Sequence, residues 1–265
     1  MYAFTYHRPD TVRKAASLLS GQDDAKILAG GQTLLPTMKQ RLASPGNLID
    51  LRSIPGLNGI TQSGRSVTIG AMTPHADVAA SEIVRSQIPA LAELAGMIGD
   101  PHVRHRGTIG GSIANNDPAA DYPAACIGLG ATIVTNKRKI AADEYFTGLF
   151  ETALEEGEII TEVRFPIPTR AAYVKFRQPA SRFALVGVFV AKRGSDVRVA
   201  VTGAGSSGVF RVPSFEAALQ ARFGAKSLDG LTVSADNINS DIHASADYRA
   251  HLIGVLAKRA VAAAK

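Results

Sequence analysis

The sequence contains a single cysteine, Cys126, among its 265 residues. One thiol cannot form an internal disulfide, and structural zinc and iron–sulfur sites typically take about four protein ligands, most of them thiolates. The sequence therefore excludes a fold held together by disulfides. It also excludes a chain that holds an iron–sulfur cluster by itself.

Long apolar runs are missing as well. No stretch reaches the roughly 18 consecutive apolar residues that a membrane-spanning helix needs, and the N-terminal segment, MYAFTYHRPD, lacks an apolar region after a basic start. Hydrophobic residues nevertheless make up 46% of the chain and charged residues 20%, so the chain can bury a core. We expect a folded cytoplasmic protein with no membrane span.

Aromatic residues are scarce, with 6 Tyr, 10 Phe and no Trp. The 29 Lys and Arg outnumber the 23 Asp and Glu, which gives a net charge of +6. A nucleic-acid-binding domain is one interpretation, but few aromatics are available to stack on bases and no long basic run occurs. The densest basic cluster, Lys137-Arg138-Lys139, is typical of an exposed turn between strands. A mild basic excess also suits a protein that holds an anionic cofactor.

Apolar periodicity divides the chain into three parts. Residues 1–55 predict strand, helix, strand, helix and strand, with Asp10 capping the first helix, a second helix over 34–42, and strands over 26–29 and 47–51. Residues 56–168 predict a hairpin (60–62 and 66–69), helices within 74–84 and 88–95, and strands over 131–134 and 158–165. Residues 107–121 show little periodicity, so they are either a functional loop or a misassigned element.

The last part, residues 169–265, predicts an antiparallel meander over 171–178, 185–193 and 196–204, followed by a short extended piece and a helix within 209–223. A final helix is expected over 248–263. The predicted fold class is α+β. We place one two-lobed domain at 1–168 (lobe one 1–55, lobe two 56–168) and a C-terminal α+β domain at 169–265.

The first stretch that suggests chemistry is AGGQTLLP at 29–36, where a strand turns into a helix. Adjacent glycines adopt backbone angles closed to other residues and let main-chain N–H groups approach a ligand. Such a turn at a helix N-terminus favours a phosphate group. An ordinary strand-to-helix turn is the alternative interpretation.

The second stretch is TIGGSIANNDPAAD at 108–121. Its Gly-Gly-Ser turn predicts another nest of backbone donors, and the Asn and Asp side chains that follow are suited to bonding sugar or ribityl hydroxyls. A polar surface loop is the alternative. Two phosphate-binding turns fit one pyrophosphate better than two monophosphates, so a dinucleotide such as FAD is the simplest ligand.

Other motifs carry less weight. The segment GAGSSG at 203–208 matches the pattern G-x-G-x-x-G, but a β-prone stretch follows it in place of the required helix, so we interpret it as a structural turn. His102 and His105 alternate with arginines, which oppose metal binding. No serine lies in a G-x-S-x-G setting. Glu155, Glu156 and Glu158 are interpreted as a solvated turn.

Together the two glycine segments resemble the FAD-binding medium subunits of molybdenum hydroxylases, the group of carbon monoxide dehydrogenase, related bacterial aldehyde and N-heterocycle enzymes, and the flavin domain of xanthine dehydrogenase. FTYHRP at 4–9, NLIDL at 47–51 and IGAMT at 69–73 extend the similarity over essentially the whole chain. The resemblance implies a two-lobed, vanillyl-alcohol-oxidase-like (PCMH-type) FAD-binding domain, followed by a C-terminal α+β domain with a small antiparallel sheet and helices.

The resemblance also implies the residues that bind FAD. Gln32-Thr33 replaces a His-Ser pair of close relatives, and Ser112 replaces an Asn, but both changes keep hydrogen-bonding groups. An acid that bonds cofactor hydroxyls matches Asp121, and a basic residue near the flavin matches Arg177. The full candidate set is Ala29, Gly30, Gly31, Gln32, Thr33, Leu34, Thr108, Ile109, Gly110, Gly111, Ser112, Asn115, Asp121 and Arg177. No catalytic side chain and no metal ligand is expected.

By resemblance, the chain is the FAD-carrying electron-transfer subunit of a heterotrimeric molybdenum hydroxylase. A large subunit would hold the molybdenum cofactor and oxidise the substrate, and a small subunit would hold two-iron–two-sulfur clusters, in a dimer of heterotrimers. Electrons would pass from the clusters to FAD and then to an external acceptor. The alternatives are a stand-alone FAD-dependent oxidoreductase of the same fold and, less favoured, a nucleic-acid-binding basic domain.

Overall fold

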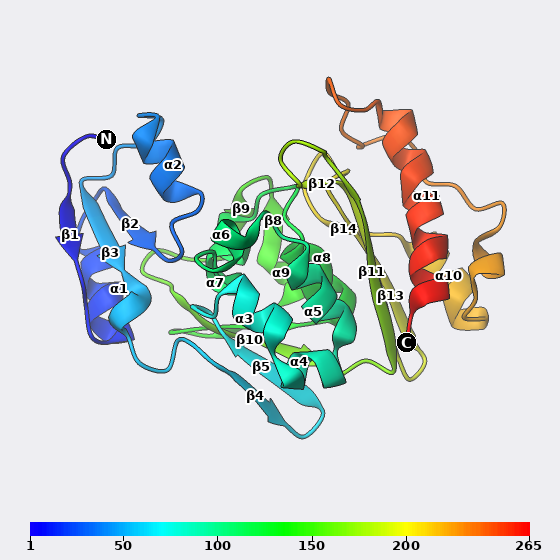
Figure 1. The fold of residues 1–265 in the computed structure, drawn as a ribbon, viewed down its shortest axis with the longest axis horizontal. Coiled ribbons are helices and arrows are strands. Elements are labelled where there is room, and N and C mark those ends of the chain that lie inside the picture. The colour runs from blue at the N-terminus through cyan, green and yellow to red at the C-terminus, as the bar shows by residue number, and fades with distance from the viewer.

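The computed structural model describes residues 1–265. Figure 1 shows lobe one (blue) at one end of the molecule, lobe two (cyan to green) in the middle, and the two C-terminal helices at the other end. A four-stranded sheet stands between lobe two and those helices, so each part of the chain packs chiefly on the next one along the sequence.

Lobe one contains a parallel three-stranded sheet in the order β1-β3-β2. Its elements are β1 (Thr5–His7), α1 (Val12–Ser20), β2 (Ala25–Leu28), α2 (Leu34–Lys39), β3 (Asn47–Asp50) and the 3-10 turn η1 (Leu51–Ser53). The predicted order of elements is confirmed. The predicted cap is wrong, because Thr11 accepts the Lys14 N–H while Asp10 pairs with the Lys14 ammonium at 2.8 Å.

Lobe two is built on an antiparallel sheet in the order β4-β5-β10-β6-β7. The strands of this sheet are β4 (Ile60–Ser63), β5 (Ser66–Gly70), β6 (Thr132–Thr135), β7 (Lys139–Ala141) and β10 (Ile160–Pro166). A separate two-stranded sheet consists of β8 (Phe146–Gly148) and β9 (Glu151–Thr152). One row of paired residues crosses the sheet: Ile60, Ile69, Val163, Ile133 and Ile140. Because side chains alternate along strands, this apolar row faces the helices.

The helices of lobe two are α3 (His75–Ala80), α4 (Glu82–Gln87), α5 (Pro89–Gly96), α6 (Pro101–Arg104), α7 (Ile109–Asn115), α8 (Tyr122–Leu129) and α9 (Ala142–Tyr145). The single helix expected within 74–84 is two helices, because Ser81 ends α3 and caps α4 by accepting the Val84 N–H. The 107–121 stretch is not a loop throughout, since Thr108 caps α7 and the side chains of Ile109 and Ile113 are buried on one face.

The C-terminal domain is the expected meander with helices on its outer face. Its elements are β11 (Arg170–Arg177), β12 (Ala184–Arg193), β13 (Asp196–Thr202), β14 (Phe210–Arg211), α10 (Pro213–Ala221), η2 (Ala225–Leu228) and α11 (Ala246–Ala263). Helices α5 and α8 pack on one face of the sheet and α10 and α11 on the other. Tyr173 and Phe189 therefore belong to the core of lobe two, so the chain's main core continues past residue 168. The GAGSSG turn leads into β14, not into a helix.

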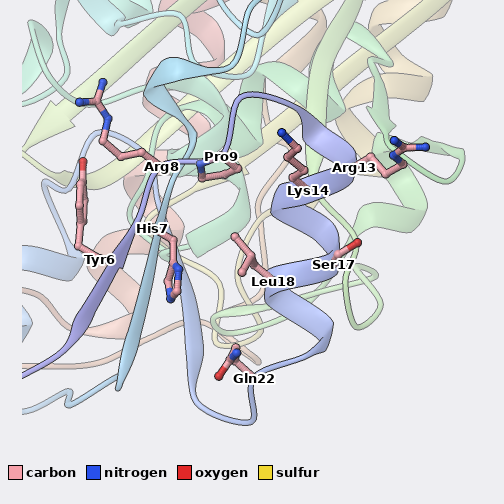
Figure 2. Close-up of a pocket in the computed structure, with 9 residues that line it drawn as sticks. All are labelled: Tyr6, His7, Arg8, Pro9, Arg13, Lys14, Ser17, Leu18 and Gln22. Carbon is pink, nitrogen blue, oxygen red and sulfur yellow. The ribbon is translucent and has the colours of Figure 1, made fainter.

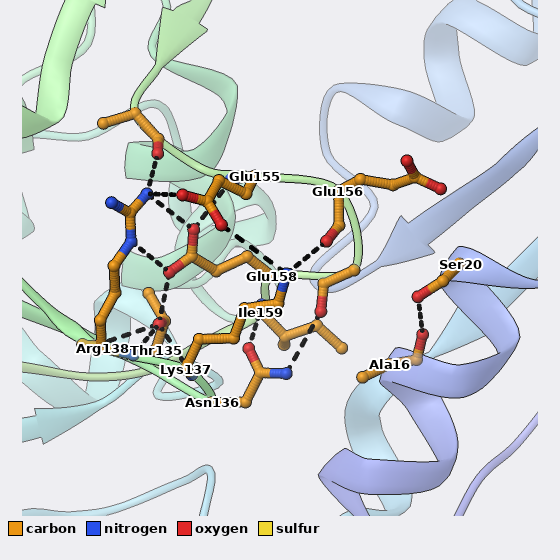
Figure 3. A network of polar contacts seen from close by, with 12 residues as sticks. Ala16, Ser20, Thr135, Asn136, Lys137, Arg138, Glu155, Glu156, Glu158 and Ile159 are labelled. Carbon is orange, nitrogen blue, oxygen red and sulfur yellow. Dashed lines mark hydrogen bonds and ion pairs between the residues drawn. The ribbon is translucent and has the colours of Figure 1, made fainter.

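A polar network joins the Lys137-Arg138-Lys139 turn to the turn before β10 (Figure 3). The side chain of Glu158 is fully buried and accepts bonds from Arg138 at 3.0 Å and Thr135 at 2.7 Å. Burial alone would raise the pKa of Glu158, but the bonds from Arg138, the Glu155 N–H and Thr135 lower it to about 2. The solvated turn expected at Glu158 is therefore wrong for this carboxylate, which is a structural anchor.

We expect Glu158→Gln to lower the free energy of unfolding by about 1.5–3 kcal/mol at pH 7, because hydrogen bonds to a charged group are lost. A depressed pKa means that this stabilisation is complete above pH 4.5 and disappears as the pH falls toward 2. Urea unfolding at several pH values measures both effects. The exposed neighbour Glu156→Gln is the control; an equal loss in both variants would contradict the anchoring role.

No helix of the chain is long and apolar enough to span a bilayer.

Candidate functional site

The first glycine turn lies at the carboxyl edge of the parallel sheet, directly after β2 and Ala29. Gly31 has φ +73°, a left-handed conformation that favours glycine. None of the backbone N–H groups from Gly30 to Leu34 has a hydrogen-bond acceptor in the chain. Gln32 and Thr33 are exposed and the other three residues are half-buried, so this row of donors is open to an anion from solvent. Open α/β sheets bind ligands at this edge.

The second glycine turn has a different role. The Ile109 N–H donates to Thr73 O at 3.2 Å, the Gly110 N–H to Ala71 O at 2.8 Å, and the Gly111 N–H to Thr108 Oγ1 at 3.1 Å. The expectation that these groups form a second nest of open donors is therefore wrong. What the glycines allow is close packing, because a Cβ on Gly110 would lie 2.6 Å from the Ala71 oxygen.

The two turns touch each other. A Cβ built on Gly30 would overlap the carbonyl oxygen of Arg106 and lie 2.6 Å from the Cα of Gly107. A Cβ on Gly111 would lie 3.3 Å from the Cβ of Ala29. The missing side chains thus let two backbone segments, far apart in the sequence, meet at one place beside the open N–H groups.

The remaining candidate residues differ in their surroundings. Thr108 is buried and caps α7, while Ser112 and Asn115 are half-buried on the same helix. Arg177 is exposed at the end of β11, in the C-terminal domain. The Asp121 side chain is only 5% exposed and already holds two partners, so it does not face solvent as the glycine turns do.

Asp121 accepts a hydrogen bond from the Tyr173 hydroxyl and pairs with the Lys175 ammonium at 2.8 Å. Burial raises the pKa of Asp121, and the charge of Lys175 and the bonds from Lys175 and Tyr173 oppose that shift. Arg177 also acts on the carboxylate through its charge. Two of the predicted residues therefore interact: β11 carries Arg177, and the same strand carries Tyr173 and Lys175, which bond Asp121.

Sequence reasoning missed His75, which lies beneath the second turn. The backbone N–H of His75 donates to Gly107 O at 3.0 Å. The imidazole ring packs so closely against this turn that a Cβ on Gly107 would lie 2.6 Å from Nε2. The ring is 5.3 Å from the ring of Tyr122. Burial lowers the pKa of His75 to about 4, and the charge of Arg104 acts in the same direction. A lone histidine at a helix start gave no signal of this position.

Acidification from pH 6.5 to 4 is expected to remove up to about 3 kcal/mol of stability, because unfolded His75 binds a proton in this range and the folded residue does not. Stability is thus complete above pH 6.5 and falls as the pH drops. Chemical unfolding against pH tests this, and His75→Leu is expected to lose this part of the slope. The exposed His102→Gln is expected to keep it. An unchanged slope in His75→Leu would contradict the assignment.

A groove of about 650 Å³ lies on lobe one, and none of its lining residues belongs to either glycine turn (Figure 2). Arg8, Arg13 and Lys14 make it basic. It runs beside β1, an edge strand of three residues. Two of these charges have partners within lobe one, because Arg8 donates to Ser53 Oγ at 2.7 Å and Lys14 pairs with Asp10 at 2.8 Å.

The His102–Arg106 stretch forms α6 and the turn after it. Arg104 donates to the Ile98 and Gly99 carbonyls at 3.0 and 3.1 Å, and the His105 ring contacts Pro101 O at 2.7 Å. The Arg106 carbonyl is the atom against which Gly30 packs. This stretch therefore supports the contact between the two turns.

One protein family, described as the FAD binding domain in molybdopterin dehydrogenase, matches residues 2–168. The chain is 39% identical over 278 residues to the carbon monoxide dehydrogenase medium chain of Hydrogenophaga pseudoflava, with 98% of this chain and 96% of that one covered. It is 37% identical over 281 residues to the nicotine 6-hydroxylase medium subunit of Paenarthrobacter nicotinovorans, with coverage of 98% and 96%.

Solved structures give the same result. Carbon monoxide dehydrogenase from Hydrogenophaga pseudoflava, in a form that lacks the Mo-pyranopterin moiety, matches with a TM-score of 0.87 and 38% identity over 99% of this chain and 97% of that chain. The reconstituted enzyme from Oligotropha carboxidovorans matches with a TM-score of 0.89 and 33% identity over 99% and 98%. The predicted α+β fold is confirmed.

Proposed function

Because the chain belongs to the family of FAD-binding domains of molybdopterin dehydrogenases, we propose that it is the FAD-carrying electron-transfer subunit of a three-subunit molybdenum hydroxylase. The observation that carries the proposal is the row of open N–H groups from Gly30 to Leu34, pressed against the second glycine turn. Open backbone donors at a helix start favour an anionic group such as a pyrophosphate, and the second turn, whose own N–H groups are bonded within the chain, supplies the backbone packed beside them.

The residues present fit FAD. The Gly30–Leu34 N–H groups would hold the pyrophosphate, beside Gly111 and Ser112 of the second turn. Asn115 and Arg177 would bind other parts of the cofactor, and Asp121, held by Lys175 and Tyr173, would support them. When bound, FAD supplies the redox chemistry of the subunit. The chain's own groups bind and orient it, and no side chain is needed as an acid, base or nucleophile.

Partner subunits follow from the same proposal. Cys126 is fully buried and is the only cysteine, so iron–sulfur clusters belong to another chain. We assign the molybdenum cofactor to a large subunit and the clusters to a small one, in a cytoplasmic dimer of heterotrimers that delivers electrons to an external acceptor. The names of the relatives, a carbon monoxide dehydrogenase medium chain and a nicotine 6-hydroxylase medium subunit, support a complex with further subunits.

Co-expression with candidate large and small subunits, followed by affinity purification on this chain, tests the proposal. The expected product contains one FAD per copy of the chain, together with molybdenum and iron, and its flavin is reduced when the partner's substrate is added. A chain that purifies alone with FAD and is reduced directly by a nicotinamide would instead be a stand-alone oxidoreductase. A colourless chain with salt-dependent nucleic-acid binding would refute both readings.

A further inference from the structure

The C-terminal domain forms hydrogen bonds and an ion pair with the segment that links the second glycine turn to α8. This segment, Asn116–Asp121, runs from the end of α7 to the start of α8. The Gly203 N–H donates to Pro118 O at 2.9 Å, and Thr202 Oγ1 donates to Ala120 O at 2.6 Å. The end of β13 is therefore hydrogen-bonded to the backbone of the segment that follows α7, the helix of the second glycine turn.

An ion pair between Lys175 and Asp121 joins the C-terminal domain to the end of this segment. The Lys175 side chain is 1% exposed and the Asp121 side chain 5% exposed, and their charged atoms lie 2.8 Å apart. Tyr173, two residues earlier on the same face of β11, donates its hydroxyl to the other oxygen of the carboxylate. Both oxygens of Asp121 are thus held by the C-terminal domain.

Stability does not explain such a pair well. Removing two charges from water costs about as much as their attraction returns, so apolar residues of similar size would hold the domains together equally well. A buried ion pair does fix geometry, because neither charge can leave its partner. The geometry fixed here is that of the segment Asn116–Asp121, which follows the predicted cofactor contact Asn115 and ends at the predicted contact Asp121. Arg177 lies two residues beyond Lys175.

On the premise that the chain binds FAD as proposed above, we infer that Lys175, assisted by Tyr173, is a positioning residue for the flavin. It acts through Asp121, and so the C-terminal domain completes a site whose glycine turns belong to the first two lobes. Lys175 itself contacts Asp121 and not the glycine turns, and its charge, with that of Arg177, offsets the buried carboxylate beside the cofactor.

The test is a double-mutant cycle in the complex purified with its co-expressed partners, read out by FAD affinity and by the reduction potential of the bound flavin. Lys175→Met is expected to weaken FAD binding at least tenfold and to lower the two-electron potential. Each tenfold change in relative affinity for the two redox states corresponds to about 30 mV. In an Asp121→Asn background the same substitution is expected to add less than a twofold change, because its effect passes through Asp121.

Arg211→Met is the matched control. Arg211 forms an ion pair of the same length, 2.8 Å, with Glu216 of α10. This pair does not include a residue of the segment Asn116–Asp121. The Arg211→Met variant is expected to have a lower melting temperature but the same FAD affinity and the same flavin reduction potential as the wild type. Wild-type affinity and potential in Lys175→Met would overturn the inference. So would an effect of equal size in the Asp121→Asn background. A wild-type complex without FAD would overturn the proposed function as well.

Discussion

Gly30→Ala is expected to reduce the FAD content of the purified complex at least fivefold. The added Cβ would overlap the Arg106 oxygen and lie 2.6 Å from the Gly107 Cα. Both atoms belong to the backbone, so no side chain can rotate out of the way. Separating the turns by overpacking costs roughly 1–3 kcal/mol, and each 1.4 kcal/mol is a factor of ten in affinity. Flavin absorbance per polypeptide after heat release measures the loss.

The control for this substitution is Gly96→Ala, at the end of α5 in lobe two. A Cβ on Gly96 would have its nearest neighbour, the Ala79 Cβ, at 3.9 Å, which is ordinary contact. This variant is expected to keep its FAD. If Gly30→Ala retained as much FAD as Gly96→Ala, the contact between the two turns would have no part in cofactor binding.

Arg249→Met is expected to cause the largest loss of stability, about 3–5 kcal/mol. The Arg249 side chain is 4% exposed and donates to the Leu185 and Gly203 carbonyls at 2.7 and 2.9 Å and to Asp241 at 2.7 Å. Its removal leaves two buried carbonyls without donors. For a chain of this size the melting temperature should fall by about 10 °C. Calorimetry or circular dichroism measures the shift.

This substitution also tests the interpretation of the GAGSSG turn. Gly203 opens that turn, and α11 holds it through Arg249, which is a structural role. The folded fraction of Arg249→Met is therefore expected to bind one FAD at saturation. Arg259→Met, at an exposed position of the same helix, should change stability by less than about 0.5 kcal/mol. A stable Arg249→Met variant that binds no FAD would show that the turn serves the cofactor directly.

The sequence predicted most of the architecture because its signals were local. Alternating apolar residues predicted the meander, and helical spacing predicted α1 and α11, since each pattern needs only its own segment. The predictions that were wrong depended on one or two residues. Thr108 and the Ile109–Ile113 pair make α7 a helix, but glycine, asparagine and aspartate nearby gave the stronger impression of a loop.

The site was predictable only in part, for a physical reason. Adjacent glycines mark a turn in the sequence, but not the direction their missing side chains would have faced. The structure shows that Gly30 faces the Arg106–Gly107 backbone. Lys175 gave no signal at all, because a lysine in a strand is usually solvated, and its partner Asp121 lies 54 residues away.

The complex is first freed of its flavin and then titrated with FAD, FMN and ADP in a calorimeter. The three affinities show whether the protein binds the cofactor through its pyrophosphate. The two touching glycine turns predict one FAD per chain, FMN weaker by at least tenfold, and ADP that competes with FAD because it carries the same diphosphate. FMN bound as tightly as FAD, with no competition from ADP, would mean that the open N–H groups from Gly30 to Leu34 do not hold a pyrophosphate.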